Sequence, residues 1–189
     1  LLERKSELAE KVIEDDDIIN EREVETDEFC LKLLALRQPA ARDLRFITTA
    51  IKINYDLERI GDLAVNICER VLELNKEPQL KPYIDLPTMA NIAQLMVKES
   101  LEAFVKEDVE LALKVTRDDE RVDQLLDQIF RELLTYMMQD LRTITRATRL
   151  LFISKYLERM ADHAVNIAEL VIFMVEGKII RHLKTAPEE

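Results

Sequence analysis

Two stretches of this sequence carry the same acidic residues at the same spacing. Residues 57–71 (LERIGDLAVNICERV) return one hundred positions later as residues 157–171 (LERMADHAVNIAELV), with ten of the fifteen positions identical. The shared polar residues form four pairs, namely Glu58 and Glu158, Asp62 and Asp162, Asn66 and Asn166, and Glu69 and Glu169. On a helix these side chains fall within an arc of about 80°, because successive residues turn by about 100°. Such a face could bind a cation through its carboxylate oxygens.

A second polar row precedes the first of these stretches. It consists of Asp16, Asn20, Glu23 and Asp27, which fall within about 60° of one another on a helix. If two antiparallel helices place both rows side by side, six or more oxygen ligands come together. Hard or borderline cations prefer such ligands, so we expect Mg²⁺, Ca²⁺, Mn²⁺, Zn²⁺ or iron, and the sequence leaves the choice open.

The corresponding row in the second half is shorter. Asp119 and Asp123 begin it, but Leu126 and Phe130 stand at the positions that Glu23 and Asp27 hold in the first half. We therefore expect a second site that is smaller or differently built.

A charged stripe on a helix can also be a simple solvated face. Like charges four residues apart destabilise a helix by a few tenths of a kcal/mol per pair. The residues four positions away from these acids are mostly acids or amides rather than lysine or arginine. The repetition of the array in two copies favours a bound cation over the solvated stripe.

The chain is predicted to be all-α, because glycine occurs only twice and helix-favouring residues dominate. The pattern predicts helices over about 6–37, with a break near Glu14, and over 42–75, 87–106, 108–139 and 144–176, the last ended by Gly177. Prolines in 75–87 mark the joint between two tandem repeats, 1–84 and 85–189. Each repeat is read as a three-helix bundle, with the first helix of the first bundle largely absent from this chain.

Composition excludes several classes of protein. The net charge of −11 argues against a nucleic acid partner, which requires an excess of lysine and arginine. No apolar run is long enough to span a membrane, and no signal-peptide pattern is visible. Cys30 and Cys68 lack disulfide or zinc spacing, which favours a reducing, cytoplasmic setting.

No set of residues resembles an active site. The two histidines, His163 and His182, form no Glu-x-x-His pair, which argues against a di-iron carboxylate oxidase. His163 lies near the apolar edge of its helix and is read as a packed or capping residue rather than a ligand. Serine, histidine and aspartate form no nucleophile relay, and no glycine-rich phosphate loop is present. We expect a protein that is not an enzyme, with a carboxylate-bridged metalloenzyme as the remote alternative.

The chain resembles the PhoU family. The matching segments are VIEDDDIINEREVETDEFC (12–30), RQPAARDLR (37–45), LERIGDLAVNICE (57–69), TRDDERVDQ (116–124), LTYMMQDLRTI (134–144) and LERMADHAVNIAE (157–169). The resemblance implies two homologous three-helix bundles with metal clusters on their acidic motifs. It implies Glu58, Asp62, Glu158 and Asp162 as ligands, with Asp16, Asn20, Asp119 and Asp123 in second rank.

The resemblance also implies a function. PhoU-like proteins are negative regulators of phosphate uptake and of phosphate-starvation signalling, and they act with the phosphate ABC transporter and a sensor histidine kinase. A cytoplasmic protein, peripheral at the inner membrane and able to form a homodimer, is expected on this basis. The alternative is a regulatory domain or accessory protein of a sodium–phosphate or inorganic phosphate transporter.

Overall fold

The computed structural model describes residues 1–177, and this part of the chain is built from α-helices without strands. This confirms the predicted all-α class. The elements are α1 (Ser6–Arg37), α2 (Ala41–Asn75), α3 (Asp85–Lys106), α4 (Val109–Gln139), the short 3₁₀ helix η1 (Leu141–Thr143) and α5 (Ile144–Glu176).

The helix ends follow from local chemistry. Gln38 adopts a left-handed conformation (φ 44°) directly before Pro39, which disfavours further helix at that point. Asp108 begins α4 by accepting a hydrogen bond from the backbone N–H of Leu111. Gly177, with φ 71°, ends α5 as predicted. The expected break near Glu14 was wrong, because α1 runs without interruption through an acidic stretch that is mostly exposed to water.

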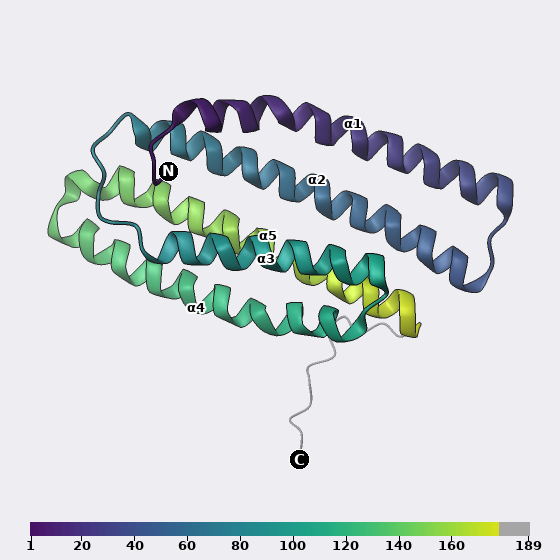
Figure 1. Ribbon diagram of the computed structural model, residues 1–189. Helices are drawn as coiled ribbons and strands as arrows, with labels where there is room; N and C mark the ends of the chain where they lie inside the picture. The colour runs from purple at the N-terminus through teal and green to yellow at the C-terminus, as the bar shows by residue number, and fades with distance from the viewer. Residues whose placement is uncertain (178–189) are drawn as a thin grey trace, which may run out of the picture.

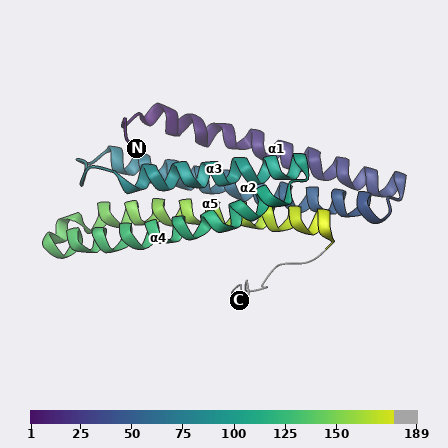
Figure 2. The ribbon, with the colours of Figure 1, turned by 60° about the horizontal axis from the view of Figure 1, so that its bottom comes forward.

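The helices run roughly alongside one another in an elongated bundle, with α1 at one edge and α4 at the other (Figures 1 and 2). Between them, α5 contacts α2, α3 and α4. Within residues 1–177, α1 contacts no helix except α2. The two motif helices, α2 and α5, thus pack directly against each other at the centre of the molecule.

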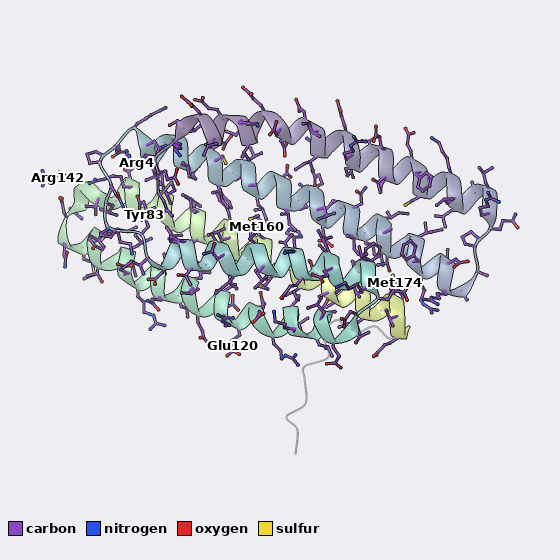
Figure 3. The ribbon with its side chains drawn as sticks, viewed as in Figure 1. Arg4, Tyr83, Glu120, Arg142, Met160 and Met174 are labelled. Carbon is purple, nitrogen blue, oxygen red and sulfur yellow. The ribbon has the colours of Figure 1, made fainter. Side chains whose placement is uncertain are left out.

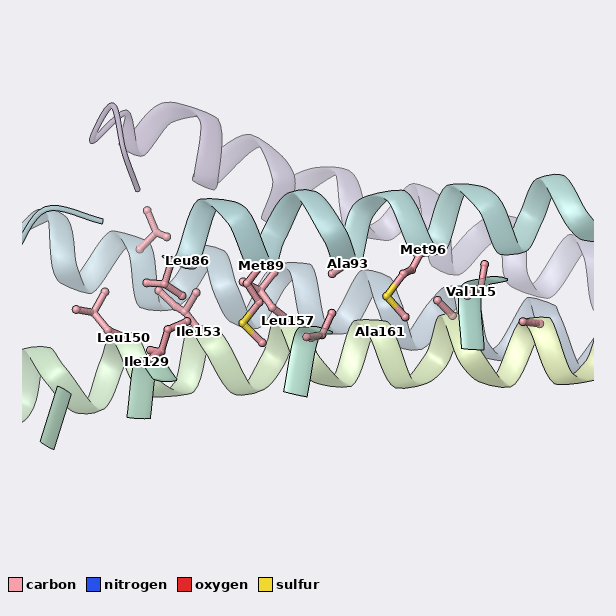
Figure 4. Packing of buried hydrophobic residues seen from close by; sticks show 14 of the residues in the cluster. Leu86, Met89, Ala93, Met96, Val115, Ile129, Leu150, Ile153, Leu157 and Ala161 are labelled. Atoms are coloured by element: carbon pink, nitrogen blue, oxygen red, sulfur yellow. The ribbon is translucent and has the colours of Figure 1, made fainter. Parts of the chain in front are cut away.

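Most of the core lies among α3, α4 and α5. Met89 and Met96 of α3 pack with Val115 and Ile129 of α4 and with Leu150 of α5, and all five are almost fully buried (Figure 4). The same cluster continues into the first half of the chain through Ala9, Val71 and Leu74. One core therefore joins both halves, which is why the relative positions of α2 and α5 are fixed.

The two halves differ in what covers their helix pairs. Val12 and Ile19 of α1 are both 40% exposed, whereas their counterparts in α4, Val115 and Val122, are completely buried beneath α3. Over the described residues, no helix occupies the position on α1 and α2 that α3 occupies on α4 and α5. This agrees with the expectation that the first bundle lacks its first helix here.

The connector between the halves is held by basic side chains at one end of the bundle, where Arg4 and Tyr83 lie (Figure 3). Arg4 donates to the carbonyl oxygens of Asn75 and Glu77 at 2.7 and 2.6 Å. From the start of α5, Arg146 donates to the carbonyl of Pro78 at 3.0 Å. These contacts fix the path of the chain between α2 and α3.

Candidate metal centres

The acids of the second half gather where α4 and α5 lie against each other. Asp119 and Asp123 come from α4, and Glu158 and Asp162 come from α5. Glu158 is 9% exposed when the whole residue is counted. Its Oε1 accepts a hydrogen bond from Lys155, one turn earlier on the same helix. Its other oxygen, Oε2, is buried without a hydrogen-bond partner, and so is Oδ1 of Asp119. A buried oxygen without a partner is costly, so both atoms favour a bound cation or proton.

Burial and neighbouring carboxylates raise the pKa values of the three aspartates in this group. Burial, reinforced by Asp123, Asp162 and Glu158, raises the pKa of Asp119 to about 6. The pKa values of Asp123 and Asp162 are raised as well, first by partial loss of water and then by Glu158. Lys155 opposes both shifts. The site thus holds more negative charge than its surroundings offset, which is the condition that attracts a cation.

The acids of the first half gather between α1 and α2 in the same way. Loss of water raises the pKa of Glu58, and the charges of Asp62, Glu23 and Asp16 add to the effect while Arg59 opposes it. Oε2 of Glu58 is buried without a hydrogen-bond partner, as Oε2 of Glu158 is in the second half. Each motif glutamate therefore has one buried oxygen that accepts no hydrogen bond, and the two glutamates stand at equivalent positions of the duplicated sequence.

Gly61 allows the two helices of the first site to approach closely. A Cβ atom at Gly61 would stand 3.2 Å from Cδ1 of Ile19 and 3.3 Å from Oδ1 of Asp16. A groove of about 420 Å³ opens beside this point, with Glu23, Asn54 and Glu58 on its walls. The carboxylates on this side are accordingly within reach of solvent ions.

The remaining residues of the row on α1, Asn20 and Asp27, form hydrogen bonds with other side chains. Asn20 is exposed and donates to Oδ2 of Asp16 at 3.2 Å. Asp27 accepts from the side-chain amide of Asn54 at 3.0 Å, and that same amide donates to the carbonyl of Glu23 at 2.8 Å. Asn54 was not among the residues expected at the site. It ties the far end of the row to α2.

Basic partners are present although none stands four residues from the motif acids. Arg59 donates from Nη1 to Oδ2 of Asp62 at 2.8 Å and lies 3.4 Å from Oε2 of Glu58, without hydrogen-bond geometry to the latter. Lys155 pairs with Glu158. The contacts of Arg59 with Asp62 and of Lys155 with Glu158 use a spacing of three residues, which brings side chains together on one face of a helix. They offset part of the carboxylate charge in each half.

Within residues 1–177, no three histidine, cysteine, aspartate or glutamate side chains are arranged so that they could hold one metal ion. Burial and neighbouring acids raise the pKa values of Glu58, Asp119, Asp123 and Asp162, yet the carboxylates do not form a finished ligand set in their present rotamers. Binding of a cation by these residues would require side-chain rotation toward the unsatisfied oxygens. The ligand assignment therefore stays a prediction.

His163 is packed between helices, in line with expectation. Its Nδ1 lies 2.8 Å from Oδ1 of Asp56, a buried residue of α2. This contact joins residues 107 positions apart. No local sequence signal identified Asp56 as the partner. His182 lies outside the described residues.

None of the described helices is long and apolar enough to cross a membrane.

Comparison with known proteins agrees with this architecture. The family model described as "PhoU domain" matches residues 1–71 and 86–171. A phosphate-specific transport system accessory protein PhoU homolog from Pseudomonas aeruginosa is 44% identical over 184 residues, which is 97% of this chain and 76% of that protein. The homolog from Aquifex aeolicus is 46% identical over 176 residues, covering 93% of this chain and 80% of its own length.

Solved structures give the same result. The crystal structure of PhoU from Pseudomonas aeruginosa superposes with a TM-score of 0.91 at 44% identity, over 94% of this chain and 86% of that one. The phosphate transport system regulatory protein PhoU from Streptococcus pneumoniae superposes with a TM-score of 0.86 at 32% identity, over 94% and 83% of the two chains. A family match over both halves, together with close relatives of the same fold, shows that the chain belongs to the PhoU family.

Proposed function

We propose that this protein is an accessory protein of phosphate-specific transport that represses phosphate uptake and phosphate-starvation signalling without catalysing a reaction. Support comes from family membership and from relatives that are named as accessory or regulatory proteins of phosphate transport. In this proposal the protein acts on the cytoplasmic side of the inner membrane, with the phosphate ABC transporter and a sensor histidine kinase as partners.

We further propose that both acidic sites bind metal ions. The observation that carries this proposal is the pair of buried oxygens that accept no hydrogen bond, Oε2 of Glu58 and Oε2 of Glu158, at equivalent positions of the duplicated motif. In the first half the ligands would come from Glu58, Asp62, Asp16 and Glu23, and in the second from Glu158, Asp162, Asp119 and Asp123. An all-oxygen set suits iron, Mg²⁺, Mn²⁺ or Ca²⁺.

The arrangement suggests how such binding would matter to partners. A bound cation would supply the positive charge that offsets repulsion among the carboxylates. In each half the ligands lie on two neighbouring helices, Asp16 on α1 with Glu58 on α2, and Asp119 on α4 with Glu158 on α5. A cation bound by residues of both helices would hold the two helices of a pair, and therefore their outer faces, in one relative position. The surface offered to the transporter and the kinase would then depend on metal content.

Elemental analysis of protein purified without chelator tests the metal proposal. We expect the variant Glu58→Ala/Asp62→Ala to lose the metal of the first half, and Glu158→Ala/Asp162→Ala that of the second. The matched control is Glu25→Ala/Glu28→Ala, which removes two exposed acids from α1. Metal content unchanged in both site variants would remove these residues from the proposed centres.

Regulation is tested separately in cells that lack their own accessory protein. We expect the wild-type chain to restore repression of a phosphate-starvation reporter in phosphate-rich medium, and the exposed-acid control to do the same. The two site variants should restore repression only in part. If folded wild-type protein leaves the reporter fully active, the regulatory proposal fails even where metal is bound.

A further inference from the structure

The corner where α1 turns into α2 stands clear of the other helices. In Figures 1 and 2 it extends beyond the end of α5 and beyond the turn between α3 and α4. We call residues 29–52 the basic corner; they comprise the last turns of α1, the turn at 38–40 and the first turns of α2. Side chains that point outward from this corner are therefore open to large partners.

The basic corner reverses the charge of the rest of the molecule. The whole chain has a net charge of −11, yet this corner holds five basic residues against one acid, Asp43. Four of the five are exposed, and the set consists of Lys32, Arg37, Arg42, Arg45 and Lys52. Lys32 and Arg42 pair with the exposed acids Glu28 and Glu107, and exposed pairs of this kind contribute little. A local positive excess on an acidic protein directs that corner towards anionic surfaces.

Large apolar side chains project from the same corner. Phe29 and Leu36 are 62% and 80% exposed, and their spacing of seven residues places both on one face of α1. Leu31, on the opposite flank of α1, is 61% exposed, and Leu44 at the start of α2 is 42% exposed. Apolar side chains flanked by lysine and arginine are typical of segments that enter the interface of a lipid bilayer.

Shape favours a bilayer over a protein as the partner of the basic corner. The exposed side chains lie on the outside of a protruding corner, and a protein would need a matching concave, acidic surface to cover them. A bilayer needs no such fit, because its headgroups part around apolar side chains while anionic lipids attract the basic ones. The acidic remainder of the chain is repelled by the same lipids, so the bundle meets the surface end-on. The acidic site at Asp16 and Glu58 lies further along α1 and α2 and stays off the surface.

The opposite corner of the bundle supplies an internal comparison. Residues 131–149 join α4 to α5 at the end where Arg142 lies (Figure 3). They hold four arginines against two acids, half the positive excess of the basic corner. Met138 and Leu141 are 83% and 74% exposed there. Exposed apolar side chains thus occur at both ends, and charge distinguishes the end that faces an anionic surface.

We propose that the basic corner binds the surface of an anionic lipid bilayer. Phe29, Leu31 and Leu36 enter the headgroup region, and Lys32 and Arg37 contact lipid phosphates. The inference rests on the proposed function for the location at the inner membrane, and it adds a direct lipid contact that needs neither the transporter nor the kinase.

Tryptophan fluorescence tests the contact directly, because the chain contains no tryptophan. Leu36→Trp places a single reporter in the basic corner, and Met138→Trp is the matched control at the opposite corner. We expect the emission of Leu36→Trp to shift to shorter wavelength when vesicles of phosphatidylethanolamine with phosphatidylglycerol are added, in buffer with chelator to exclude metal bridging. Rising salt should diminish the shift. Vesicles of phosphatidylcholine alone should give no shift, and Met138→Trp should give none with either lipid.

Cosedimentation with the same vesicles measures what each kind of side chain contributes. Leu36→Glu and the double variant Lys32→Gln/Arg37→Gln should each lower the partition of the protein onto anionic vesicles by about tenfold or more. Circular dichroism checks that the variants are folded. Two control variants change exposed residues of the opposite corner and should bind as the wild-type chain does, namely Met138→Glu and Arg131→Gln/Arg142→Gln.

Three results would overturn the proposal. They are a wild-type chain that does not bind anionic vesicles, equal binding to phosphatidylcholine, and equal loss of binding in the variants of both corners. If Leu36→Glu abolishes repression in cells while the wild-type chain does not bind vesicles, the corner contacts an acidic protein instead. Repression by a chain that does not bind vesicles would leave the regulatory proposal intact, so the two proposals fail separately.

Discussion

At the scale of single residues, the fold disfavours the ionised form of Asp119. Its pKa is raised to about 6 by burial and by three neighbouring carboxylates, compared with about 3.9 in an unfolded chain. The folded state therefore binds this proton more tightly than the unfolded state does. The stability that Asp119 contributes is fully present below about pH 4 and is lost as the pH rises through about 6.

We predict that Asp119→Asn stabilises the metal-free protein at pH 7 by about 1–2 kcal/mol, a value reduced to allow for the partial exposure of the group. The amide keeps the shape of the side chain and removes the charge. Urea denaturation in the presence of chelator should show this gain at pH 7 and little difference near pH 4. Asp127→Asn, an exposed change on the same helix, should have almost no effect. A gain of equal size at both pH values would contradict the electrostatic cause.

The sequence located the acidic residues but not their environments. The helical wheel treats Glu58 and Glu158 as equivalent, yet their side chains are 22% and 12% exposed, because different neighbours cover them. The pairing of Lys155 with Glu158 was missed because only four-residue spacings were considered. Which carboxylate oxygens accept no hydrogen bond depends on how α1 packs against α2 and α4 against α5. The local sequence pattern carries no information on that packing.

At the scale of helices, sequence was a good guide to where elements begin and end. Pro39 and Gly177 act through the backbone of their own segment, so their effect is independent of the rest of the fold. The contact of Asp56 with His163 is different in kind. It depends on how α2 crosses α5, and the residues are too far apart in sequence for any periodicity to link them.

We predict that this contact stabilises the packing of α2 against α5. Asp56→Ala should lower the free energy of unfolding by about 1–3 kcal/mol, because it leaves a mostly buried ring nitrogen of His163 without its partner. His163→Leu, which introduces the residue found at position 63, should also be destabilising because it leaves the buried Asp56 unpaired. The double variant should cost less than the sum of the two.

Chemical denaturation of the four proteins of this cycle measures the coupling. Lys52→Ala, an exposed change one turn before Asp56 on α2, serves as the control and should alter stability by less than about 0.5 kcal/mol. Strictly additive effects of the two single variants would mean that Asp56 and His163 do not depend on each other.

At the scale of the whole molecule, the duplicated sequence predicted two repeats. The boundary between them, placed between residues 84 and 85, stays a prediction. The core cluster runs across this joint through Val71, Leu74 and Leu86. Burial is nevertheless unequal. Fourteen residues of α5 are buried, whereas α1 buries only Ala9 and Cys30. Within residues 1–177, α5 packs against three α-helices and α1 against α2 alone, which accounts for the imbalance.

We therefore predict a gradient of local stability from α5 to α1. Opening α1 breaks contacts with α2 alone, so it exposes little apolar surface and requires less free energy than opening α5, which contacts three helices. Hydrogen exchange measured by mass spectrometry should show amides in residues 10–30 exchanging at least about tenfold faster than those in 150–170, after correction for intrinsic rates. Met96→Ala, which opens a cavity against α4 and α5, should speed exchange in α5 and leave α1 nearly unchanged. Equal protection in both helices would instead mean that the bundle opens as one cooperative unit, and that the packing of α1 on α2 is stronger than its few buried residues imply.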